Sequence, residues 1–155
     1  MLLLHSAMAN KIHIKNKKVF REYVLEDKVV AGIQLVGTEI KSIRAGKVNL
    51  VDSYCFFSRG ELFVRGIHIA EYVFGTHWNH VATRERKLLL NKKELLKLEK
   101  KVKEKGLTIV AIRLFLNDRG LAKLEIALGR GKKLYDKRED IKRKDISRDA
   151  ERRFK

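Results

Sequence analysis

The chain has 155 residues, of which 36 are Lys or Arg and 19 are Asp or Glu, so its formal net charge is +17. A single cysteine excludes an intramolecular disulfide and a multi-cysteine metal site, and it fits a reducing compartment. No apolar run approaches the roughly 20 residues of a membrane-spanning helix, and the opening segment lacks a signal-peptide core. We therefore expect a cytoplasmic protein without a membrane partner.

The excess of positive charge indicates a nucleic-acid partner. Lys and Arg side chains release condensed counterions when they contact phosphates, and a sequence pI of about 10.1 is typical of nucleic-acid-binding domains. A merely soluble basic surface is the alternative, but solubility alone does not require so large a charge.

Changes in composition divide the chain into three parts. Residues 1–9 form an extension without periodicity, residues 10–129 hold most of the apolar content, and residues 130–155 form a basic tail. The tail has too few apolar side chains to offset its ordering entropy, so we expect it to be disordered when free. Its acid-before-base pairs at i,i+4 favour a helix once a partner is bound.

The first half of the domain predicts a strand followed by a short helix. Residues 19–36 are rich in Val and Ile and alternate loosely, as in a long bent strand or a pair of strands. Residues 38–46 predict a helix that Thr38 caps and Gly46 ends, with Glu39 near its positive end.

The second half predicts two hairpins with a helix between them. The hairpins cover residues 53–69 and 107–128, and the helix begins at Asn91 and ends at Gly106. Short antiparallel strands with peripheral helices favour a mainly β fold, namely an OB-like antiparallel β-barrel with flanking helices. A split α+β sheet is the alternative.

No side-chain pattern indicates catalysis, a metal or a cofactor. Cys55 lies in an apolar run, where a buried structural thiol is the usual case. His77 and His80 have no nearby carboxylate or thiol to complete a metal site, so we expect surface or loop histidines. Because phosphate-loop, nucleophile-elbow and zinc-protease motifs are also missing from the sequence, we expect no enzyme.

Basic side chains gather in four clusters along the chain. They lie within residues 11–21, 41–47, 84–87 and 131–138. Polar side chains able to contact bases or riboses interrupt these clusters, which favours RNA over a merely soluble surface. We expect the leucines at 88–90 to lie mainly in the core, with one exposed leucine able to pack on a base.

Four ordered motifs carry a resemblance to a known family. They are GTEIKSIRAGKVNLVDSY (37–54), GELFVRGIHIAEY (60–72), RERKLLL (84–90) and GKKLYDKRE (131–139). From about Asn10 to its C-terminus, the chain resembles the SsrA-binding protein family, the partners of transfer-messenger RNA. The resemblance implies an OB-like barrel and a non-enzymatic role in trans-translation, the rescue of stalled ribosomes.

The resemblance also implies two RNA-facing sites. The surface for the tRNA-like domain of transfer-messenger RNA comprises Asn16, Glu39, Lys41, Arg44, Lys47, Arg84, Arg86, Lys87 and Leu89. The segment for the decoding site and message channel of the 70S ribosome comprises Lys132, Lys133, Tyr135, Asp136, Lys137 and Arg138. We accordingly expect a monomer that delivers the RNA to stalled ribosomes and senses the empty channel with a tail that becomes helical there.

A structural ribosomal protein or a general single-strand RNA-binding OB module is the alternative interpretation. Such a binder needs neither the motif at 131–139 nor a conditional helix. A single-strand platform also exposes several rings, whereas only 8% of this chain is aromatic and most rings lie in apolar strand runs. These features favour the rescue factor.

Overall fold

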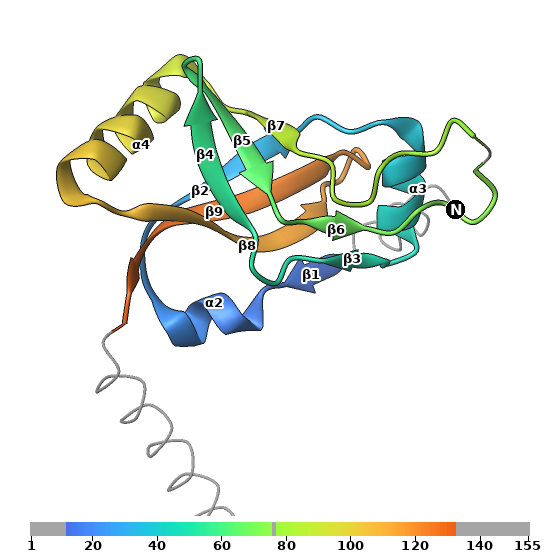
Figure 1. Cartoon of the computed structure of the whole chain (residues 1–155), viewed down its shortest axis with the longest axis horizontal. Coiled ribbons are helices and arrows are strands. Elements are labelled where there is room, and N and C mark those ends of the chain that lie inside the picture. The colour runs from blue at the N-terminus through green and yellow to red at the C-terminus, as the bar shows by residue number, and fades with distance from the viewer. Residues whose placement is uncertain (1–11, 76, 133–155) are drawn as a thin grey trace, which may run out of the picture.

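A computed structural model describes residues 12–75 and 77–132 of the chain. Its strands are β1 (His13–Lys15), β2 (Tyr23–Ile33), β3 (Val48–Asn49), β4 (Tyr54–Ser58), β5 (Glu61–Arg65), β6 (His68–Ile69), β7 (Arg86–Leu89), β8 (Thr108–Leu116) and β9 (Ala122–Gly131). Its helices are α2 (Lys17–Glu22), α3 (Gly37–Arg44) and α4 (Lys92–Lys105). Figure 1 shows the strands wrapped around a common core, with the helices at the periphery.

The larger sheet closes into a barrel. Its strands follow the order β4, β5, β7, β2, β9 and β8, and β8 pairs in turn with β4. All pairings between the described strands are antiparallel, and β1 pairs with the later half of β8. β3 and β6 form a separate two-stranded sheet. The OB-like barrel is therefore confirmed, and the split-sheet alternative is wrong.

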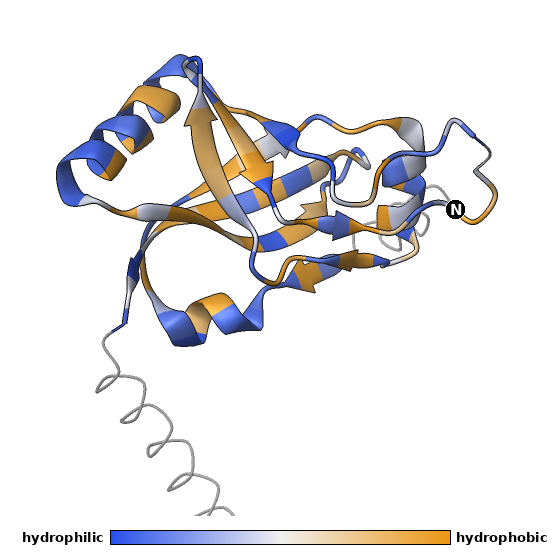
Figure 2. Cartoon of the chain, in the orientation of Figure 1, coloured by the Kyte–Doolittle hydropathy of each residue, from blue (hydrophilic) through white to orange (hydrophobic). Residues whose placement is uncertain are grey.

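Alternating side chains fill the barrel interior, because successive residues of a strand point to opposite faces. Leu62, Leu88, Leu124 and Ile126 are buried in one core cluster. Figure 2 shows the apolar residues along the strands and on the barrel side of α4. Cys55 joins this core, and burial raises the pKa of its thiol, which confirms the expected structural role.

Both expected hairpins form. β4 pairs with β5, and the turn residues Arg59 and Gly60 have φ angles of 52° and 78°. Glycine suits this turn because it adopts a positive φ without steric cost. β8 pairs with β9, and the amide of Asn117 donates to the carbonyl of Leu121 at 2.9 Å across the second turn.

Local signals define both ends of α4. The side chain of Asn91 accepts a hydrogen bond from the amide of Glu94 at 2.9 Å. At the other end, Gly106 has a φ of 63° and its amide donates to the carbonyl of Val102 at 3.0 Å. Leu98 is buried between these ends. The helix predicted from Asn91 to Gly106 is confirmed.

The start of the expected long strand is instead a helix. Residues 17–22 form α2, and β2 begins only after it, so the strand prediction over 19–36 is wrong for its first residues. Val19 is buried, while Lys18 and Glu22 form an i,i+4 ion pair at 3.9 Å. A short apolar run satisfies either a strand or a buried helix, so its pattern alone does not separate the two.

β9 runs past the expected end of the domain at residue 129. It continues to Gly131, so Arg130 and Gly131 pair with β2 and belong to the barrel rather than to the tail. The amide of Lys132 then donates to the carbonyl of Glu22 at 2.9 Å. The last described residue therefore lies beside the end of α2.

The predicted extension at 1–9 and the tail beyond Lys132 lie outside the described residues. Across residues 12–75 and 77–132, no helix is long and apolar enough to cross a membrane. The same residues contain no group of three His, Cys, Asp or Glu side chains placed to hold a metal ion.

Asn91→Ala removes the side-chain cap of α4, and we expect the free energy of unfolding to fall by about 0.5–2 kcal/mol. Asn91→Asp is the matched control, because its carboxylate keeps the acceptor and favours the positive end of the helix. Urea unfolding of both variants measures the difference. Equal losses in the two variants would contradict the capping role.

Candidate nucleic-acid interface

The first turn of α3 forms around Glu39. Val36 is the N-cap residue, in place of the expected Thr38. The amide of Val36 donates to Glu39 Oε1 at 3.0 Å, and the amide of Glu39 donates to the carbonyl of Val36 at 3.1 Å. The hydroxyl of Thr38 instead lies 2.8 Å from His80 Nδ1. The predicted helix is confirmed, but the glutamate closes its first turn.

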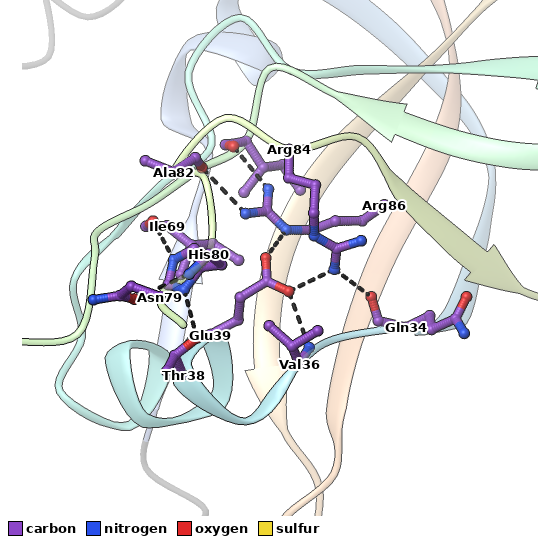
Figure 3. Close-up of polar contacts among 11 residues, drawn as sticks. Gln34, Val36, Thr38, Glu39, Ile69, Asn79, His80, Ala82, Arg84 and Arg86 are labelled. Carbon is purple, nitrogen blue, oxygen red and sulfur yellow. Dashed lines mark hydrogen bonds and ion pairs between the residues drawn. The ribbon is translucent and has the colours of Figure 1, made fainter. Parts of the chain in front are cut away.

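Glu39 is fully buried and binds two arginines, as Figure 3 shows. Arg84 Nη2 donates to Glu39 Oε1 at 2.5 Å, and Arg86 Nε donates to Glu39 Oε2. Arg86 is also fully buried, and it donates to the carbonyls of Ile67 at 3.0 Å and Ala82 at 3.1 Å. Charge-assisted hydrogen bonds thus join α3, β7 and the connection between β6 and β7.

These ion pairs keep Glu39 ionised. Burial raises the pKa of its carboxyl group, but hydrogen bonds from Arg84, the Val36 amide and Arg86 outweigh this effect and hold the pKa below its ordinary value of 4.5. Burial lowers the pKa of Arg86, and its hydrogen bond to Glu39 opposes that change. The buried site therefore contains a carboxylate between two guanidinium groups at neutral pH.

Four of the predicted RNA-binding cations lie on or beside α3. We call Lys41, Arg44, Lys47 and Arg84 the α3 cluster. The first three are exposed, whereas Arg84 is half-buried over Glu39. Lys41 Nζ lies 5.0 Å from the centre of the Tyr72 ring, and neither Arg44 nor Lys47 forms an ion pair within the described part of the chain. The cluster therefore presents positive charge to the outside.

Two more predicted residues lie on β7. Leu89 is 52% exposed, Leu88 is buried and Leu90 is half-buried. This agrees with the expectation that one of these leucines is exposed and the others lie mainly in the core. Lys87 Nζ lies 2.9 Å from a carboxylate oxygen of Glu61. A side chain at Gly32 of β2 would come within 3.2 Å of Leu89 Cβ, so glycine leaves room for the outward leucine. This part of the surface is more apolar and more neutral than the α3 cluster.

Asn16 is buried at the start of α2. Its Nδ2 donates to the carbonyls of Leu50 and Ala111, both at 3.1 Å, and ties the start of α2 to β8. Asn16, Glu39 and Arg86 are at most 1% exposed. Their side chains are thus buried within the fold, and their part in RNA binding stays a prediction.

Of the residues predicted for the ribosomal decoding site, Lys132 alone falls within the described residues, where it is half-buried. Lys133, Tyr135, Asp136, Lys137 and Arg138 lie outside them. Their role in the decoding site and the message channel stays a prediction.

The connection between β6 and β7, residues 70–85, contains side chains that the sequence reasoning missed. His80 is a loop histidine, one of the two expected alternatives, but it is buried, and its Nε2 lies 2.9 Å from the carbonyl oxygen of Ile69. Phe74 and Trp78 are 81% and 83% exposed. The available signal was the presence of bulky rings in a segment that has neither strand nor helix periodicity.

Comparisons with known proteins place this geometry in a family. The chain matches the family described as SmpB protein over residues 13–155. The SsrA-binding protein of Bacteroides thetaiotaomicron is 58% identical over 144 residues, and that of Phocaeicola vulgatus is 60% identical over 144 residues. Both alignments cover 93% of this chain and 96% of the relative. A solved chain described as "tmRNA-SmpB: a journey to the center of the bacterial ribosome" is 43% identical, with a TM-score of 0.67 over 79% of this chain and 86% of that chain.

Glu39→Gln leaves Arg86 as a buried cation without its carboxylate, so we expect the free energy of unfolding at pH 7 to fall by about 3–5 kcal/mol. Glu61→Gln is the control, because it breaks the partly exposed pair with Lys87 and should cost less than about 1 kcal/mol. Urea unfolding of both variants tests the difference. Similar small losses would contradict the role of the buried carboxylate.

The same carboxylate predicts acid lability. Because the pKa of Glu39 is lower in the folded chain than its ordinary value of 4.5, its ionisation stabilises the fold above that value. This stabilisation is lost as the pH falls through the lower, folded-state pKa. We expect the stability advantage of the parent over Glu39→Gln to shrink between about pH 5 and about pH 2 in urea unfolding experiments. A constant advantage over that range would contradict the shift.

Proposed function

The chain belongs to the SmpB protein family, and on this basis we propose that it binds the tRNA-like domain of transfer-messenger RNA. The relatives named SsrA-binding protein and the similar chain of a tmRNA-SmpB structure support this proposal. In it, the protein is a non-enzymatic factor of trans-translation that works in the cytoplasm without a cofactor. Its partners are transfer-messenger RNA and the 70S ribosome.

The main support for the proposal is the α3 cluster, most of whose positive charges are exposed while the carboxylate of Glu39 is buried. Glu39 points inward to Arg84 and Arg86, so α3 and its following turn show Lys41, Arg44 and Lys47 to solvent. Cations at phosphates release counterions and supply affinity. Phosphate contacts from a fixed frame also set the orientation of a folded RNA.

The buried residues of the predicted site act indirectly in this proposal. Glu39 and Arg86 position Arg84, whose guanidinium also lies 3.4 Å from the carbonyl oxygen of Gln34. Asn16 holds the start of α2 against the barrel. On β7, Leu89 supplies apolar contact to a ribose or an unstacked base, and Lys87 would exchange its pairing with Glu61 for a phosphate.

The second half of the proposal concerns the tail, which delivers the complex to stalled ribosomes and senses an empty message channel. Figure 1 shows α3 and the end of β9 at opposite ends of the barrel, so two partners can bind without competing for one surface. The basic residues at 132–138 would meet ribosomal RNA, and Tyr135 would stack on a base of the decoding centre. A channel filled by message would exclude the tail.

The exposed rings of Phe74 and Trp78 favour a second candidate, a general single-strand RNA-binding OB module. Competition separates the two candidates in a gel shift with the tRNA-like RNA. A rescue factor retains its complex against excess unrelated tRNA and single-stranded RNA, whereas a general binder loses it.

Single Ala substitutions of Lys41, Arg44 or Lys47 should weaken binding to the tRNA-like RNA. Each should flatten the plot of log affinity against log salt by about 0.7–0.9 per lost phosphate contact. Titrations of labelled RNA at several salt concentrations measure both effects. Lys100→Ala is the control, because Lys100 is an exposed cation of α4 at the far end of the barrel. A flat salt response in the parent protein would contradict a phosphate-led interface.

Truncation after Lys132 keeps β9 and its contact with α2, so we expect the affinity for the isolated tRNA-like RNA to change by less than about twofold, or ~0.4 kcal/mol. The same truncation should abolish peptide tagging on stalled ribosomes. Tyr135→Ala in the full chain should lower the tagging yield through lost stacking, worth about 1–3 kcal/mol per base. Parallel losses of RNA affinity and tagging would show that the two ends are wrongly assigned.

A further inference from the structure

The most exposed rings of the described chain lie together in the connection between β6 and β7. Phe74 is 81% and Trp78 is 83% exposed, and Val73 and Val81 of the same connection are 70% and 66% exposed. Figure 1 shows this connection projecting beyond α3, away from the barrel core. Apolar side chains concentrated on a projecting segment mark an interaction site, because a folded chain alone gains nothing from their exposure.

The base of this connection is fixed although its rings are exposed. The side chain of Asn79 accepts from the amide of Tyr72 at 3.2 Å and donates to its carbonyl at 2.8 Å. The amide of Gly75 donates to the same carbonyl at 2.8 Å, and a Cβ at Gly75 would lie within 2.4 Å of Asn79. Tyr72 in turn lies under Lys41 of α3. The segment is therefore braced against α3, which preorganises it for binding.

A cavity connects Trp78 with the α3 cluster. It has a volume of about 470 Å³ and is lined by Val36, Gly37, Thr38, Lys41, Trp78, Asn79, His80 and Arg84. Within the described part of the chain, this lining contains two basic side chains and no acidic one, because Glu39 points inward to its arginines. A cavity lined by an aromatic ring and two cations suits a planar group that is flanked by phosphates.

We propose that Trp78 is a stacking arm for an unpaired base of the RNA that the α3 cluster binds. The inference rests on the proposed function, and it adds a base-stacking site to the cations that bind phosphates. Lys41 and Arg84 meet the phosphates next to the base, while the ring of Trp78 covers its face. Base–aromatic stacking tolerates any base, so the arm adds affinity without reading sequence.

The sequence contains one tryptophan, so tryptophan fluorescence of the full-length parent protein, excited at a wavelength that tyrosine does not absorb, reports on Trp78 alone. Titration with a transcript of the tRNA-like domain should quench this fluorescence and protect it from acrylamide. Trp78→Ala should bind the same transcript about 5- to 150-fold more weakly, which corresponds to ~1–3 kcal/mol. The slope of log affinity against log salt should not change, because no phosphate contact is lost.

Two further variants separate stacking from general apolar contact. Trp78→Phe keeps a ring and should bind within about threefold of the parent, whereas Trp78→Leu keeps the bulk and should bind nearly as weakly as Trp78→Ala. Leu96→Ala removes an exposed apolar side chain of α4, at the end of the barrel opposite α3, and should leave RNA affinity unchanged. Because these side chains are exposed, circular dichroism and urea unfolding should match the parent in all four variants.

The outcomes distinguish this inference from the function on which it rests. Parent-like RNA affinity of Trp78→Ala, with no quenching in the parent, overturns the stacking arm but leaves the proposed function intact. Parent-like RNA affinity with reduced binding to ribosomes also overturns it and assigns the rings to a protein partner. If the parent does not prefer the tRNA-like transcript over unrelated tRNA, the proposed function itself is wrong.

Discussion

Burying Glu39 removes a carboxylate from water, and such an ion is costly unless hydrogen-bond donors surround it. The chain supplies those donors from three places: the amide of Val36, the guanidinium of Arg84 and the guanidinium of Arg86. Because the donors come from the start of α3, the segment before β7 and β7 itself, one side chain fixes how these elements meet. The same contact holds Arg84 in place beside α3.

Inward charge and outward charge have different roles as a result. The Glu39–Arg86 pair is fully buried, so in the proposed function it positions neighbouring side chains and does not itself contact RNA. Lys41, Arg44 and Lys47 keep their charges free of acidic partners within the described residues, and they are available to phosphates. A cationic surface that carried its own exposed carboxylates would lose part of its attraction to RNA through internal pairing.

Features set by neighbouring residues could be predicted from the sequence. The cap at Asn91, the glycine after α4 and both hairpins depend on local backbone and side-chain chemistry, and all are observed. The remaining features, namely α2 and the buried charges, depend on packing between residues that are far apart in the sequence. Residues 17–22 form a helix because Val19 packs inward, and Glu39 and Arg86 are buried because each supplies the other with a partner. No spacing along the chain distinguishes a charge that faces RNA from one that faces an arginine inside the fold.

The central claim is that the buried pair acts on RNA only by positioning Arg84. Replacing both members in Glu39→Met/Arg86→Met removes the pair without stranding a charge, an exchange that is often neutral for stability. The most direct measurement is the affinity of this folded double variant for the tRNA-like RNA, beside Arg84→Ala and the parent. The account predicts that the double variant unfolds cooperatively yet binds RNA as weakly as Arg84→Ala. A folded double variant with the affinity of the parent would contradict it.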